Sequence, residues 1–165
     1  MAITIPSLIF GFLLIPAFLG LVVSIGTTRD AHRWHGLMGI GFSLIYSVFI
    51  SFNYFAQIAF LIKGVEVPIW LAMDNTDSLF MVIEMLGYFF MGLATLVLVP
   101  FFSNSALGKS IKVLFLANAI LGIGGLAGYA LGWPMSILLA GLVLWNIIMP
   151  VAAILIYLEC KSSQH

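Results

Sequence analysis

The chain has 165 residues, of which 63% are hydrophobic and only 7% are charged, and its formal net charge at pH 7 is zero. Soluble domains carry roughly a quarter charged residues, so this composition excludes an ordinary soluble domain. A net charge of zero gives no basic field to attract a polyanion, and we expect no nucleic-acid partner.

Five apolar runs are long enough to cross a bilayer, since about 18 apolar residues with few charges are typical of a membrane-spanning helix. The sequence therefore predicts an all-α, polytopic membrane protein: one domain, a bundle of five transmembrane helices, in the cell membrane with the lipid bilayer as its surroundings. The predicted spans cover residues 5–26, 36–62, 76–101, 111–131 and 135–158.

The first span differs from a cleaved signal peptide in its charges. A signal peptide has a positively charged region before its apolar core. Here no Lys or Arg precedes the span, while Arg29 and Arg33 follow it. This pattern predicts a retained helix whose amino terminus lies outside.

The second span, residues 36–62, carries Ser43, Ser47 and Ser51 on one face, because helical residues four apart are neighbours. A stripe of small residues allows a neighbouring helix to approach closely. For the third span, residues 76–101, we expect Asn75, Thr76 or Asp77 as the N-cap and an end at Pro100.

The fourth span, residues 111–131, is rich in glycine. Gly124 and Gly128 have the GxxxG spacing that permits close helix packing. A tight turn at Gly132 to Pro134 leads to the fifth span, residues 135–158, and to a short polar tail that holds the only cysteine, Cys160.

Basic residues set the predicted orientation, since they are enriched in cytoplasmic loops. They lie in the first loop, around the third loop at Lys109 and Lys112, and in the tail at Lys161, whereas the second loop holds one lysine, Lys63. Loops one and three and the carboxyl terminus are therefore expected in the cytoplasm. The amino terminus and the acidic second loop are expected outside.

Glu84 is the one acidic or basic residue that lies well inside a predicted span. A charged acid at mid-membrane costs about 2.5 to 3.5 kcal/mol, so it should face protein or water rather than lipid. With the helical period, Asp77, Glu84, Tyr88, Met91 and Thr95 share a face. Glu84 is about 10 Å deeper than Asp77 along the axis, in the outer part of the bilayer.

Other polar residues are expected at a similar depth. Asn53 and Gln57 are one helical turn apart in the outer half of the second span, and Asn146 is near the middle of the fifth. We expect a ligand-binding site formed by Glu84, Tyr88, Asn53, Gln57, Asn146 and Asp77.

Two interpretations of these residues stay open. Intramembrane Glu, Asn, Gln and Tyr also form hydrogen bonds between helices without any ligand, at about 0.6 kcal/mol each on average. Asp77 at the start of a helix is equally typical of a capping residue. Against these stands the observation that ionisable residues inside a membrane are usually functional.

No catalytic residue, metal site or cofactor is predicted. His32 and His35 are two candidate metal ligands in the first loop, whereas zinc requires three or four. They also lie on the opposite side of the membrane from Glu84, so the three cannot form one catalytic site. An enzyme would depend on Glu84 alone.

The sequence supports two functional hypotheses. The first is a protein that binds, senses or transports a small lipophilic or cationic molecule in an outward-facing pocket around Glu84. The alternative is a non-catalytic structural or accessory subunit that packs against a membrane partner or forms a homo-oligomer. The glycine stripe of the fourth span and the serine stripe of the second motivate this alternative.

Overall fold

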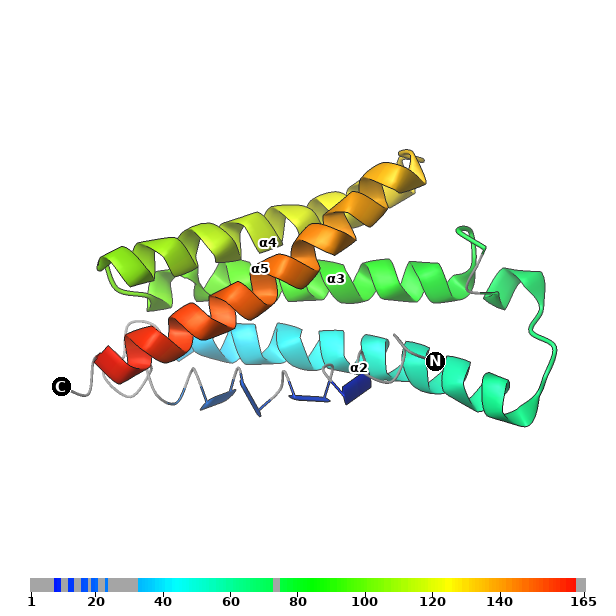
Figure 1. Cartoon of the computed structure of the whole chain (residues 1–165), viewed down its shortest axis with the longest axis horizontal. Coiled ribbons are helices and arrows are strands. Elements are labelled where there is room, and N and C mark those ends of the chain that lie inside the picture. Colours follow the sequence, from blue (N-terminus) through cyan, green and yellow to red (C-terminus); the bar gives the residue numbers. More distant parts are fainter. Residues whose placement is uncertain are drawn as a thin grey trace.

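Four long helices form the described part of the protein (Figure 1). The computed structural model describes residues 8–9, 12–13, 16–17, 19–20, 23, 33–72 and 75–162. Within these residues there is no strand, and four helices are long and apolar enough to cross a membrane. They are α2 (Arg33–Lys63), α3 (Leu79–Leu98), α4 (Ala106–Ala130) and α5 (Met135–Ser162). The prediction of an all-helical membrane protein is confirmed at this level.

The first predicted span, residues 5–26, falls mostly outside the described residues. The second, third, fourth and fifth predicted spans correspond to α2, α3, α4 and α5. Two short 3₁₀ helices, η2 (Ile69–Leu71) and η3 (Val99–Phe101), lie in the loop before α3 and directly after it. Pro100 lies within η3, which directly follows the end of α3 at Leu98.

The start of α3 corrects the predicted cap. Ser78 is the N-cap, because its hydroxyl accepts a hydrogen bond from the Met81 amide at 3.3 Å. Asn75 instead organises the preceding turn: its amide donates to the Ile69 carbonyl at 2.8 Å and its Oδ1 accepts from the Asp77 amide at 3.1 Å. Asp77 therefore lies in an exposed turn before the helix and not on its polar face.

The start of α4 is also earlier than predicted. Ser105 caps this helix, since its hydroxyl accepts from the Gly108 amide at 2.9 Å. The first turns of α4 consequently include Lys109 and Lys112, which the sequence placed in or beside a loop. A serine followed by helix-compatible residues is enough to begin a helix, even where the segment is too polar to count as part of a span.

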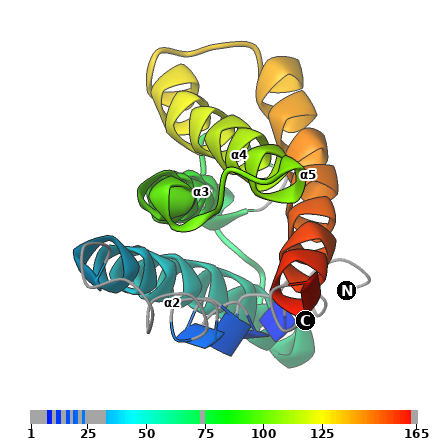
Figure 2. The ribbon, with the colours of Figure 1, turned by 90° about the vertical axis from the view of Figure 1, so that its left-hand side faces the viewer.

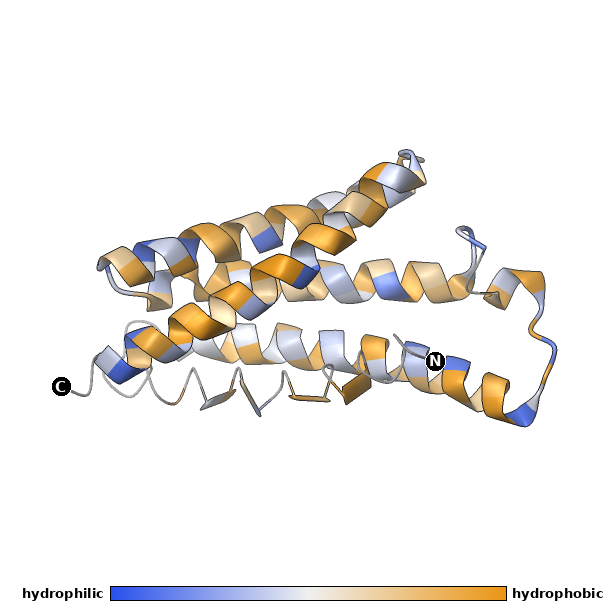
Figure 3. Cartoon of the chain, in the orientation of Figure 1, coloured by the Kyte–Doolittle hydropathy of each residue, from blue (hydrophilic) through white to orange (hydrophobic). Residues whose placement is uncertain are grey.

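The helices run up and down, with α3 in the middle. Figure 2 shows α3 nearly end-on between α2 and α4, and α3 contacts both. α5 packs on α4 near the turn that joins them, then diverges and passes in front of α3 (Figure 1). Most residues of all four helices are apolar, and polar residues are isolated within the spans (Figure 3).

Glycines set the closest helix contacts, though not the pair that the sequence indicated. A Cβ at Gly122 of α4 would collide with the carbonyl oxygen of Tyr88 and lie 3.1 Å from the Cα of Gly92 on α3. At Gly124 a Cβ would meet nothing within 4 Å, so the predicted GxxxG contact at Gly124 is wrong. The reason is helical phase: Gly122 faces α3, and Gly124, about 200° further round, does not.

The serine stripe of the second span does face the protein interior. Ser43 and Ser47 are buried, and Ser51 is half-buried. One turn further along, Ile50 lies against Gly87 of α3, where an added Cβ would be 2.9 Å from the Ile50 Cδ1. At this contact a large side chain of α2 therefore lies against a glycine of α3.

Candidate functional site

Glu84 lies between α2 and α3 with two tyrosine hydroxyls on one of its oxygens. Its side chain is only 6% exposed. Tyr54 of α2 donates to Oε1 at 3.0 Å, and Tyr88, one turn further along α3, donates to the same atom at 3.3 Å. Within the described residues both hydrogen bonds to this carboxyl group fall on Oε1. The two hydroxyls offset part of the cost of burying a polar group in an apolar bundle.

Asn53 and Gln57 form a second polar pair on α2, at the level of Glu84. The Gln57 amide donates to Asn53 Oδ1 at 3.1 Å. Asn53 is fully buried, and its Nδ2 has no hydrogen-bond partner among the described residues. Asn53 directly precedes Tyr54, which donates to Glu84. Four of the six predicted residues thus form two hydrogen-bonded pairs on adjacent helices: Glu84 with Tyr88 on α3, and Asn53 with Gln57 on α2.

The other two predicted residues lie elsewhere. Asn146 is exposed on α5, where its amide donates to the Leu142 carbonyl of its own helix at 2.9 Å. Asp77 is exposed in the turn before α3. Neither contributes a hydrogen bond to Glu84 within the described residues.

Three aromatic rings connect this polar cluster to α5. Tyr46 of α2, Tyr88 of α3 and Trp145 of α5 surround a common point, with ring centroids 6.4 Å (Tyr46–Tyr88), 6.5 Å (Tyr46–Trp145) and 5.1 Å (Tyr88–Trp145) apart. The Tyr88–Trp145 pair has the edge-to-face geometry that aromatic rings favour. Tyr88 is therefore shared: its hydroxyl contacts Glu84 and its ring contacts α5.

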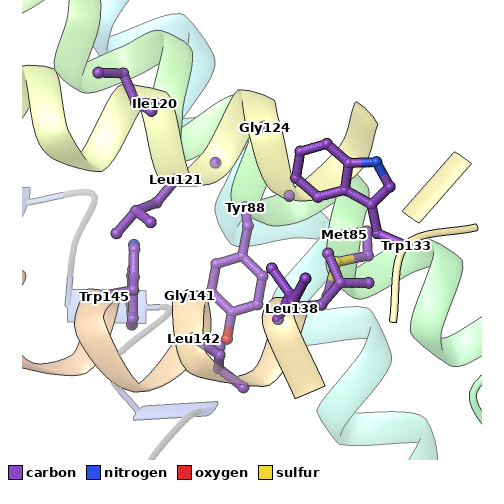
Figure 4. A pocket seen from close by; sticks show the side chains of 13 residues that line it. Met85, Tyr88, Ile120, Leu121, Gly124, Trp133, Leu138, Gly141, Leu142 and Trp145 are labelled. Atoms are coloured by element: carbon purple, nitrogen blue, oxygen red, sulfur yellow. The ribbon is translucent and has the colours of Figure 1, made fainter. Parts of the chain in front are cut away.

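A cavity of about 240 Å³, lined in part by the Tyr88 ring, lies between α3, α4 and α5 (Figure 4). Its walls are almost entirely apolar. Four of its lining residues are glycines, which leave space where side chains would otherwise fill the interface. The lining residues are Met85, Tyr88, Ile120, Leu121, Gly122, Gly124, Gly125, Trp133, Ile137, Leu138, Gly141, Leu142 and Trp145.

The cavity has a closed end and an open flank. Trp145 and Tyr88 close it toward α2, and Trp145 is only 7% exposed. At the flank between α4 and α5, Ile120 is 71% exposed and Ile137 is 53% exposed. The cavity can therefore receive an apolar group from the side of the bundle.

Trp145 and the cavity glycines were not among the predicted site residues. A signal for Trp145 exists in the sequence, since tryptophan is enriched at membrane interfaces and this one is ten residues inside its span. Such a tryptophan is more naturally accounted for by contacts within the protein. Both Gly122 and Gly124 line the cavity, and no comparable signal shows that only Gly124 has open space beside it while Gly122 closes the α3–α4 contact.

Two further polar contacts join the helices away from Glu84. Asn118 of α4 donates to the Thr95 hydroxyl of α3 at 3.0 Å, and both side chains are fully buried. At the end of α5, Glu159 Oε1 accepts from the Ser103 hydroxyl at 2.6 Å, which ties α5 to the loop between α3 and α4. In the described part of the chain, no three His, Cys, Asp or Glu residues are grouped so that they could hold a metal ion.

Comparison with known proteins adds no relative: no family model matches the chain, and no curated protein or solved structure matches it. The functional argument therefore depends on the geometry of the cavity and of the Glu84 cluster.

Proposed function

We propose that this chain is a multi-pass membrane protein that binds a small lipophilic molecule in the cavity between α3, α4 and α5. Glu84 is the polar group that responds to the ligand, through Tyr88. The observation that carries the proposal is the double contact of Tyr88, whose ring lines the cavity and whose hydroxyl donates to Glu84.

The size and chemistry of the cavity favour a lipophilic ligand over a polar one. An engineered protein cavity of about 150 Å³ with apolar walls stays free of water and binds benzene. The present cavity is larger, at about 240 Å³, and equally apolar. An apolar molecule therefore gains free energy on entry, whereas a polar one would lose its hydration without recovering hydrogen bonds.

Tyr88 gives the cavity a route to Glu84. Its bond to Oε1, at 3.3 Å, is longer than that of Tyr54, at 3.0 Å, so it is the weaker of the two. A ligand that presses on the Tyr88 ring shifts its hydroxyl and changes the hydrogen bonding of a buried acid. This arrangement suits a protein that senses or transports its ligand.

We also propose the number of spans and the orientation of the chain in the membrane. Residues 5–26 form a fifth span, the amino terminus lies outside, and the carboxyl terminus lies in the cytoplasm of a cell whose plasma membrane holds the protein. The charge pattern supports this: Lys109, Lys112 and Lys161 lie at the ends of α4 and α5 that meet on one side of the bundle.

The test is saturable quenching of Trp145 fluorescence by bromobenzene, a small apolar probe with a heavy atom. The other three tryptophans, Trp34, Trp70 and Trp133, are replaced by phenylalanine in every variant. Quenching should saturate in this protein and should be lost in Gly124→Leu, because the leucine enters open space in the cavity. Gly41→Leu is the matched control, since Gly41 is a half-buried helical glycine of α2 with equally open space.

The role of Tyr88 is tested in the same assay. Tyr88→Phe releases the ring from Glu84 and should weaken bromobenzene binding about threefold, which corresponds to the roughly 0.6 kcal/mol of one intramembrane hydrogen bond. Tyr54→Phe removes a bond to the same oxygen without changing the cavity wall and should leave the affinity unchanged. The proposal would be overturned if quenching rose linearly with bromobenzene concentration and did so to the same extent with and without Gly124→Leu.

A further inference from the structure

We infer that the cavity is entered from within the bilayer and that its occupant is one hydrocarbon chain of a membrane amphiphile, lying along the groove between α4 and α5. The inference rests on the proposed function and adds the class of ligand and its route. Three observations carry it: where the cavity opens, how far it extends along the helices, and which residues leave it open.

The opening of the cavity lies on the flank of the bundle. The strongly exposed lining residues are Ile120 of α4, Ile137 of α5 and Trp133 of the turn, and the two isoleucines belong to segments long enough to span a membrane. The medium outside such segments is lipid hydrocarbon. A molecule that enters between α4 and α5 therefore comes from the lipid phase, without crossing a polar rim.

The length of the groove matches the depth of one leaflet. It extends from Trp133, in the turn between α4 and α5, to Ile120 of α4 and Trp145 of α5. The ten helical rises from Ile120 to Ala130, the end of α4, span about 15 Å. Half of a hydrocarbon core of about 30 Å is the same distance. A lipid chain runs roughly parallel to membrane-spanning helices, so it can follow this groove over its whole length.

The groove is open because glycines line it on both helices. A Cβ added at Gly124 or Gly125 of α4 would meet nothing within 4 Å, and one added at Gly141 of α5 would meet only Leu121, at 3.8 Å. Trp133 lies at the turn end, where tryptophan is typical of the headgroup level. A headgroup at this end and a chain between the glycines is the arrangement that the groove accommodates.

The experiment places the full chain, in the background with Trp145 as the only tryptophan, in phosphatidylcholine vesicles. The vesicles contain either dibrominated or ordinary acyl chains. Trp145 is buried among the helices, so lipid that merely surrounds the bundle quenches it weakly, whereas a chain in the groove contacts it. We expect brominated chains to remove most of the Trp145 emission. Gly124→Leu should restore it, and Gly41→Leu should not.

The outcomes separate this inference from the proposed function. In one outcome bromobenzene quenches Trp145 saturably, but in brominated vesicles the Trp145 emission is the same with and without Gly124→Leu. That outcome excludes a lipid chain as the occupant and leaves the proposed binding of a small lipophilic molecule intact. If neither probe quenches in a manner sensitive to Gly124→Leu, both fail. Circular dichroism of Gly124→Leu and Gly41→Leu checks that both variants retain their helices, so that a change in quenching reports on the groove.

Discussion

The side of α3 that faces α2 is tightly packed, whereas the side that faces the groove between α4 and α5 leaves a cavity. Toward α2, and at Gly122 of α4, the glycines lie so close to neighbouring atoms that an added Cβ would collide, and the buried Glu84 has Tyr54 as a hydrogen-bond partner. Toward the groove between α4 and α5, glycines face open space and the polar residues of the walls are few. The comparison teaches that glycine has opposite uses on one helix: at Gly122 it allows contact, and at Gly124 it leaves room.

The largest effect should come from adding a methyl group on the closed side. In Gly122→Ala the new Cβ collides with the backbone carbonyl of Tyr88, which cannot rotate away, so we expect a loss of about 3 kcal/mol in the free energy of unfolding. Gly124→Ala, two residues on, should change it by less than about 0.5 kcal/mol. Unfolding by SDS in mixed micelles measures both. Equal losses in the two variants would contradict the distinction between closed and open sides.

A smaller loss is expected where the closed side is held by buried hydrogen bonds. Thr95→Val keeps the shape of the side chain but removes the acceptor of Asn118 Nδ2, which leaves a buried donor unpaired. We expect a loss of about 1 to 2 kcal/mol in the free energy of unfolding, measured in the same SDS assay.

The double variant Thr95→Val with Asn118→Leu is the control for that prediction. It removes both polar groups and should recover part of the loss, because replacing both partners by apolar groups leaves nothing unsatisfied. A double variant whose loss equals the sum of the two single variants would show that the pair is not coupled.

The two tyrosines that donate to Glu84 should contribute differently to the free energy of unfolding, because Tyr54 lies on the α2 side of α3 and Tyr88 also lines the cavity. Tyr54→Phe should cost about 1 kcal/mol and Tyr88→Phe about 0.5 kcal/mol, because the Tyr54 bond is the shorter one. Both are measured in the SDS assay without ligand. With ligand present, only Tyr88→Phe should also change affinity, since only Tyr88 reaches the cavity. The reverse order of the two losses would count against the assigned geometry.

The smallest effect is expected on the exposed face of α5. Asn146→Leu removes a hydrogen bond to the helix's own Leu142 carbonyl and exchanges a polar side chain for an apolar one. The free energy of unfolding should stay within about 0.5 kcal/mol and the affinity for bromobenzene should not change. A clear loss of binding in Asn146→Leu would return this residue to the site and weaken the contrast between the two sides.

The membrane-spanning helices could be predicted from the sequence because they depend on a local property. Apolar length identifies a membrane-spanning helix without knowledge of its neighbours, so residues 36–62 and 135–158 were found as α2 and α5 with small errors at their ends. The helix starts were predicted less well. Ser78 and Ser105 are the N-caps although neighbouring residues have a similar capping propensity, because the preceding turns decide where each helix begins. Those turns depend on contacts such as the hydrogen bond from Asn75 to the Ile69 carbonyl.

The site was predictable only where it depends on one residue. Glu84 stands out because an acid in an apolar helix is costly, and Tyr88 and Asn53 follow from helical spacing and depth. Asn146 has the same chemistry and depth, yet it faces outward, because the rotation of α5 is set by how that helix packs on α4. The cavity was not predictable at all, since it consists of volume that facing glycines leave unfilled.

The hydrogen bond between Ser103 and Glu159 has a consequence for the shape of what the groove admits. α5 is fastened at one end by this bond and at the other by the tight turn in which the Trp133 amide donates to the Gly128 carbonyl at 2.8 Å. Contacts at both ends of α5 restrain its movement relative to α4 and so limit changes in the gap between the two helices. Under the proposed function, we therefore expect the groove to admit slender flexible chains and to exclude rigid fused-ring molecules.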